Sequence, residues 1–263
     1  MSTWRAVRCE IVREMQETFF YKANLLGDFV AQVLLFGALI FLGGFHQVGM
    51  TYGAGRVETR SLVLLGYLFW SYSSWAIGEM GSNVANEAAK GTLEHRFTSV
   101  APPAALLLGK ALGGVVLSTG FVALVVGVIT LLFGVAVPLS AGALLALLLT
   151  LVGMYGIGLI FAGAALVAKR IAQLVLAMQI ILLFISGTLA PPAIFPQGLR
   201  WLSEAVPLTE GIDLARLSVT KGHIAASAWL LLALTSTAYL LLGLIAFQLF
   251  ARRAKVDGLL GRY

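Results

Sequence analysis

The residues best suited to act on another molecule lie in one short charged segment, Glu87-Ala88-Ala89-Lys90-Gly91-Thr92-Leu93-Glu94, between two long apolar runs. Glu87 precedes Lys90 by three residues and Lys90 precedes Glu94 by four. Such pairs favour a short helix by only about 0.2–0.5 kcal/mol each, so a partner has to stabilise it. Gly91 leaves one face open to close approach. We predict a coupling helix over 86–98, moved by a soluble partner through these residues: Glu87, Lys90, Gly91, Thr92, Leu93 and Glu94.

Bond-making chemistry is not predicted for this chain. His46, His95 and His223 fall in different loops, and the single cysteine, Cys9, cannot form an intrachain disulfide. No acid, base and nucleophile gather in one span or loop, and no Gly-x-x-x-x-Gly-Lys-Ser/Thr phosphate loop is present. We therefore predict no catalytic residue, no metal site, no cofactor bound by this chain and no enzyme activity of its own.

Composition places the chain in a membrane. Hydrophobic residues make up 59% and charged residues 11% of the sequence, whereas soluble domains have about 25% charged residues. Runs long enough to cross a hydrocarbon core, without the alternation of a barrel strand, predict helices. The predicted fold is all-α and polytopic, with one transmembrane domain over 1–263. Its six predicted spans are 25–45, 62–84, 106–133, 139–167, 171–189 and 226–250.

Basic residues orient these spans. Of the 18 Lys and Arg residues, 13 fall on one side, which the positive-inside rule assigns to the cytoplasm together with both termini. The basic character therefore reports topology, and no nucleic-acid partner is predicted. Residues 1–24 have an apolar face, at steps of three and four, that predicts an interfacial helix, although a charged lead-in is the alternative. The basic residues left outside are Arg56, Arg60, Arg200, Arg216 and Lys221.

Prolines interrupt the moderately apolar segment before the last span. They divide it into two pieces, roughly Ala190 to Leu202 and Val206 to Leu217, each too short to cross the membrane. We predict an extracellular re-entrant hairpin over 190–217, with an ordinary extracellular loop and surface helix as the alternative. Pro191, Pro192 and Pro207 are its candidate gate residues.

The second predicted span carries the candidate substrate path. Tyr67, Trp70 and Ser74 share one helical face that offers rings and a hydroxyl. Glu79 is the one acid well inside a span, where charge is costly. The alternatives are an ordinary packed helix interface for the first three, and a side chain that reaches or pairs at the inner interface for Glu79.

Small residues predict close helix packing in two spans. Gly113, Gly120 and Gly127 recur at heptad spacing in the third span. The fourth span holds four crowded glycines, Gly153, Gly156, Gly158 and Gly163.

In order and spacing, several short motifs resemble the membrane subunits of type-2 ABC exporters. The matching residues are Glu87, Gly91-Thr92-Leu93-Glu94, Pro102, Gly109-Lys110, Leu199-Arg200-Trp201-Leu202 and Pro207-Leu208-Thr209 with Asp213 and Arg216. One departure is Pro102-Pro103-Ala104, where the family more often has a serine and a single proline. The resemblance runs almost end to end.

This resemblance implies the biological setting. It implies an ATP-driven exporter of a small drug, lipid or lipid-linked molecule, in the cell membrane of a prokaryote. Two copies of a cytosolic ABC ATPase, which carries the ATP and Mg²⁺, would receive the coupling helices of a homodimer, or of a heterodimer of sister permeases, in membrane lipid. The alternatives are a non-transporting sensor, immunity or scaffold subunit, and an importer permease.

Overall fold

The computed structural model describes residues 22–42, 45–89, 103–168, 171–222 and 224–256. These residues form helices and connecting segments without a β-strand, which confirms the all-α class for the described part of the chain. The elements are α2 (Lys22–Leu42), α3 (His46–Tyr52), α4 (Arg56–Ala89), α6 (Pro103–Phe133), α7 (Ala141–Val167), α8 (Ala172–Ile185), the 3-10 helix η1 (Pro192–Ile194), α9 (Gln197–Glu204), α10 (Pro207–Thr220) and α11 (Ala226–Val256).

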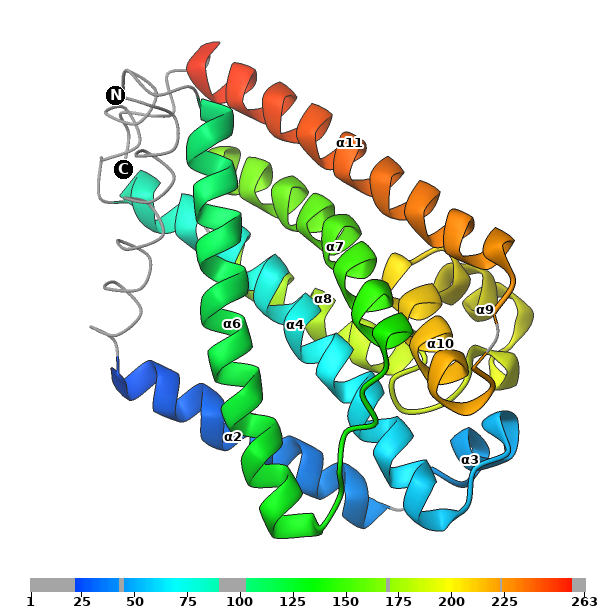
Figure 1. Ribbon diagram of the computed structural model, residues 1–263. Coiled ribbons are helices and arrows are strands. Elements are labelled where there is room, and N and C mark those ends of the chain that lie inside the picture. The colour runs from blue at the N-terminus through cyan, green and yellow to red at the C-terminus, as the bar shows by residue number, and fades with distance from the viewer. Residues whose placement is uncertain (1–21, 43–44, 90–102, 169–170, 223, 257–263) are drawn as a thin grey trace.

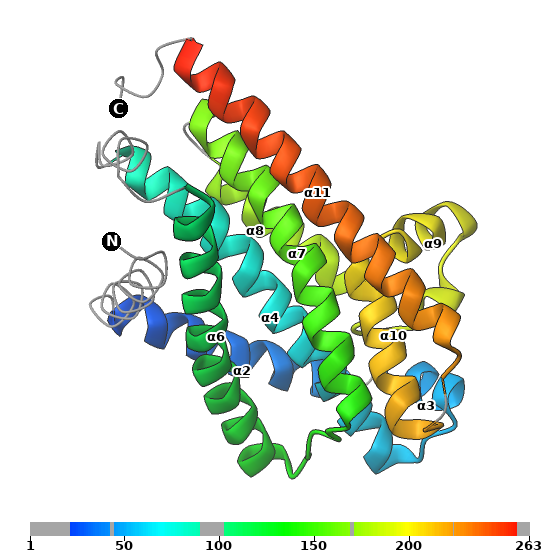
Figure 2. The same cartoon turned by 45° about the horizontal axis from the view of Figure 1, so that its top comes forward.

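Helix α7 is at the centre of the bundle. It packs against α4, α10 and α11 (Figure 1), while α4 also contacts α6 and α8 and is hydrogen-bonded to α2. In the turned view of Figure 2, α11 and α7 run side by side along most of their length. Ser140 caps the start of α7 by accepting a hydrogen bond from the Ala143 N–H at 3.0 Å.

Glycines allow α7 and α11 to approach each other at backbone distance. A Cβ atom at Gly156 would overlap the carbonyl of Tyr239, and one at Gly243 would overlap the carbonyl of Gly156. Cβ atoms at Gly153, Gly158 and Gly163 would also meet neighbouring helices at 3.0 Å or less. These contacts confirm the predicted close packing of the fourth span. Their physical reason is that small residues let two helix backbones touch.

The heptad glycines of α6 behave differently. A Cβ atom at Gly120 or Gly127 would meet nothing within 4 Å, and both residues are exposed within this subunit. Close contacts at these two positions therefore do not occur inside the described chain, although Gly113 is buried.

Three helices of the described residues are each long and apolar enough to cross a membrane: α6, α7 and α11. A fourth span is obtained if Leu25–Phe41 and His46–Tyr52, whose axes differ by 80°, form one bent unit. Helix α4 has 34 residues and runs beyond both predicted ends of the second span. The count of six spans therefore stays a prediction.

Helix α8 is shorter than the predicted fifth span. It has 14 residues and ends at Ile185, where the Ser186 N–H still bonds the Leu182 carbonyl at 3.0 Å. Gly187 follows with a φ of 79°, in the left-handed region that glycine adopts without strain. This conformation turns the chain out of the helix, so the span predicted over 171–189 stops early.

The predicted hairpin segment forms three short elements. Pro196 separates η1 from α9, so the first predicted piece is divided in two, and Pro207 begins α10, which matches the second piece closely. These elements lie with α3 and the start of α4 at one end of the bundle (Figure 1). The re-entrant course itself stays a prediction.

Candidate transport site and coupling elements

The structure describes the predicted coupling segment only at its beginning. Glu87 lies in the last described turn of α4, which continues to Ala89. The other five predicted contact residues, Lys90, Gly91, Thr92, Leu93 and Glu94, fall outside the described residues. The coupling helix therefore stays a prediction, but its first residues continue the long helix α4.

The polar and aromatic face of α4 packs against α2 through Gln32. The Tyr67 hydroxyl donates to the Gln32 backbone carbonyl at 2.8 Å, and the Ser71 hydroxyl donates to the Gln32 side-chain oxygen at 2.6 Å. Tyr67 also stacks obliquely on Trp70 and Phe36, with ring centroids 5.3 Å and 5.1 Å apart. All of these aromatic side chains are buried.

A second amide, Gln179, joins the same face of α4 to α8. The Trp70 ring N–H donates to the Gln179 backbone carbonyl, and the Gln179 side-chain amide donates to the Ser74 carbonyl, each at 2.8 Å. The packed-interface alternative thus accounts for how the Tyr67 and Trp70 side chains and the Ser74 carbonyl are held in this subunit. Their role in a substrate path stays a prediction.

Glu79 lies one turn further along α4 and is partly buried against α6. A Cβ atom at Gly114 of α6 would overlap the Glu79 carboxylate, so this glycine makes the room in which the carboxylate lies. The predicted alternatives for Glu79, a cargo or gating acid and an interfacial side chain, both stay open to experiment.

The candidate gate prolines hold the short elements in place. Pro207 begins α10 and is buried against α7, where its Cγ would lie 2.8 Å from a Cβ at Gly153. Pro191 is buried and precedes η1, and the Pro192 ring lies over Gly187, 3.2 Å from the position of a Cβ there. Their role as a gate stays a prediction.

A fully buried arginine joins these elements to α4. Arg216 of α10 is 0% exposed. Its guanidinium donates to three backbone carbonyls, those of Leu62 at 3.1 Å, Gly187 at 2.7 Å and Thr188 at 2.8 Å. The Leu62 carbonyl is in the first part of α4, whereas the other two follow the end of α8. One side chain of α10 thus binds both the first part of α4 and the segment that follows α8. We call Arg216 and the residues that contribute these three carbonyls, Leu62, Gly187 and Thr188, the Arg216 cluster.

Tyr52 completes this cluster from α3. The Arg216 guanidinium lies over the Tyr52 ring, 5.5 Å from its centre, and the Tyr52 hydroxyl donates to the Asp213 carboxylate at 2.5 Å. A phenol hydroxyl is protonated at neutral pH, so Tyr52 acts as the donor to Asp213.

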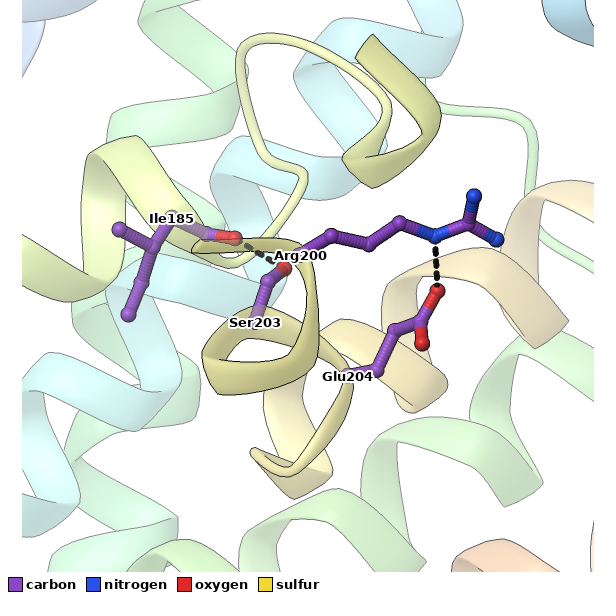
Figure 3. A network of polar contacts seen from close by, with 4 residues as sticks. All are labelled: Ile185, Arg200, Ser203 and Glu204. Atoms are coloured by element: carbon purple, nitrogen blue, oxygen red, sulfur yellow. Dashed lines mark hydrogen bonds and ion pairs between the residues drawn. The ribbon is translucent and has the colours of Figure 1, made fainter. Parts of the chain in front are cut away.

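Helix α9 is attached to the end of α8 by one hydrogen bond. The Ser203 hydroxyl donates to the Ile185 carbonyl, as Figure 3 shows. On the outer side of α9, Arg200 and Glu204 form an ion pair at 2.7 Å, with about half of each side chain exposed. Trp201 is 67% exposed, so α9 presents an aromatic side chain away from the subunit.

The family model for ABC-2 type transporters matches residues 6–220, which is most of the chain and includes every element up to α10. The chain belongs to the ABC-2 type transporter family. A comparison with curated proteins gives no match.

Membership assigns the coarse role of this ABC-2 permease. The chain is the non-catalytic, multi-pass membrane subunit, and the ATPase is a different subunit. Family membership therefore implies an ABC ATPase as partner. The long helices, buried aromatic face and absence of an ATPase motif in the sequence agree with that role.

Sequence reasoning missed three residues that organise the permease. Gln32 and Gln179 are amides within apolar runs, and a polar side chain in a span is a signal that could have been read. Arg216 was noted within the family-like segment, but nothing local indicates that it would be buried on three carbonyls contributed by distant segments.

Proposed function

We propose that this ABC-2 permease is the membrane subunit of an ATP-driven exporter that moves a small drug, lipid or lipid-linked substrate out of the cytoplasm or inner leaflet. The observation that carries the proposal is the continuity of α4. This single helix begins beside the Arg216 cluster and continues through Glu87, the first residue of the charged segment 87–94.

A continuous helix can transmit a displacement along its axis. From Leu62 to Glu87 the rise is about 38 Å, at about 1.5 Å per residue. Along that length α4 is tied to α2 by Tyr67 and to α8 by Trp70. A push at the coupling segment would therefore reach both neighbours and the short helices at the far end.

The proposed cycle needs two permeases and two ATPases. ATP binding closes the ATPases and moves both coupling helices, and the bundle changes from inward-facing to outward-facing while η1, α9 and α10 gate the exit. A second copy would cover part of the surface that one subunit leaves open. Only 17% of the apolar stretch of α11 is buried within the subunit, which suits contact with lipid or with a partner permease.

The test of coupling uses Gly91→Trp in the permease purified with its ATPase. We expect substrate-stimulated, vanadate-sensitive ATPase activity to fall by about fivefold or more, because a bulky side chain would block close approach and a coupling energy of 1–3 kcal/mol would be lost. The matched control is Gly127→Trp, at an exposed position where an added Cβ meets nothing within 4 Å.

Wild-type stimulation in the Gly91→Trp complex would contradict the coupling role. Co-purification of an active ATPase without movement of any cargo into vesicles would instead favour a non-transporting subunit. A requirement for an external binding protein would favour import.

The hairpin is tested by labelling single cysteines from Ile194 to Trp201 with an impermeant maleimide, in a Cys9→Ser background. If the segment re-enters the membrane, we expect some of these positions to react about tenfold more slowly than Lys221→Cys, because the thiol must meet water to react. Lys221 is the control because it is exposed at the end of α10. Uniform rapid labelling from outside would show an ordinary surface loop.

A further inference from the structure

A cavity of about 670 Å³ lies where the end of α2, α3 and the start of α4 meet. Its apolar wall includes Ile40, Phe45 and Met50, and its polar side includes His46, Thr59 and Arg60. The volume is within the range of small-molecule sites. Neither the aromatic face of α4 nor the Arg216 cluster lines this cavity.

The charged side chain that lines the cavity is a cation, Arg60, which favours an anionic ligand. Arg60 and His46 are exposed, and no carboxylate is among the lining residues that the structure describes. The nearest acid in sequence, Glu58, lines an adjoining cavity of about 410 Å³, which shares Gly53 and Ala54 with the first, and accepts a hydrogen bond from the Gly55 N–H at 2.9 Å. Glu58 is therefore not one of the residues that line the larger cavity with Arg60.

The surroundings indicate that the anion is part of an amphiphile. Helix α2 carries exposed apolar side chains on its way to the cavity, and the two most exposed are Leu34 at 66% and Phe41 at 86%. The adjoining axes of α2 and α3 differ by 80°, which places the cavity at the bend where the apolar helix gives way to polar residues. Apolar chains and an anionic group would each meet a matching surface there.

We propose that this cavity, which we call the bend site, binds the anionic headgroup of a membrane phospholipid. Arg60 pairs with the phosphate, His46 adds a second donor, and the acyl chains lie along α2. A free phosphate ion would use Arg60 but gain nothing from Phe41 or Met50. The inference does not rest on export, on the direction of transport or on the identity of the cargo.

Native mass spectrometry of the full chain in mild detergent tests the bend site, with phosphatidylglycerol and phosphatidylcholine as the two probes. We expect phosphatidylglycerol to bind more tightly, and Arg60→Gln to weaken its binding by about fivefold, the loss typical of one basic residue near a lipid headgroup. Arg60→Lys keeps the charge and should restore most of the affinity. Lys221→Gln removes an exposed cation outside the cavity and should change nothing.

Three results would overturn the proposal. The first is equal binding of the two lipids, and the second is an Arg60→Gln variant that binds like Lys221→Gln. The third is displacement of phosphatidylglycerol by inorganic phosphate at comparable concentration, which would show a site for a free anion. Arg60 is exposed, so its substitution should leave the unfolding midpoint unchanged.

Discussion

Arg216→Met should destabilise the permease by about 3 kcal/mol. Methionine fills much of the same volume but donates no hydrogen bond, so the carbonyls of Leu62, Gly187 and Thr188 lose their buried donor. The cost of burying the guanidinium also disappears, which keeps the loss below the sum of three hydrogen bonds. Unfolding by SDS titration in mild detergent measures the change.

The matched control is Arg200→Met on α9. Arg200 pairs with Glu204 at 2.7 Å, but about half of each side chain is exposed, and such helix pairs are worth about 0.3–0.5 kcal/mol. Equal stability of the two methionine variants would show that the Arg216 cluster contributes little.

A second variant tests the same cluster without touching the arginine. Gly66→Ala would place a Cβ against the Arg216 guanidinium, which must then move away from its carbonyls. We expect a loss of stability in the same direction as for Arg216→Met. Arg216→Lys should be intermediate, because a single ammonium cannot reach three carbonyls with the geometry of a guanidinium.

Gly156→Leu should also cost the permease about 3 kcal/mol or more, as overpacking does when the obstacle is backbone. The added Cβ would overlap the Tyr239 carbonyl of α11, and a helix backbone cannot rotate away as a flexible side chain can. Helices α7 and α11 would have to separate, so contacts along their whole interface weaken. The unfolding midpoint and the yield of folded permease measure the effect.

Gly127→Leu is the matched control for this change. It makes the same substitution inside an apolar helix, α6, where an added Cβ meets nothing within 4 Å. Its stability should stay near wild type or rise slightly, because leucine favours a helix more than glycine does. Similar losses at both positions would indicate that glycine is needed for a reason other than the α7–α11 contact.

Part of the fold follows directly from local composition. The all-α class was predictable because a backbone in lipid has to satisfy its own hydrogen bonds. The start of α10 at Pro207 and the close packing of the glycines in α7 were predictable for similarly local reasons. Helix ends were less so, since α8 stops at Ile185 whereas the predicted fifth span continues to Leu189.

The candidate site was predictable only as a set of residues. Sequence placed Tyr67, Trp70 and Ser74 on one face, but their partners, Gln32 and Gln179, are supplied by helices far away in the chain. Periodicity reports which side chains share a face, and it does not report which helix covers that face.

The sequence by itself determined the membrane class, the ABC-2 resemblance and the position of the charged segment 87–94, because each depends on composition or on short-range order. Only the tertiary structure decided that Arg216 is buried on carbonyls of α4 and of the segment after α8, and that Arg60 lines a cavity. The two arginines have the same chemistry and lie on the same predicted side. Their different surroundings come from which helices pack around each, and packing is a property of the whole chain.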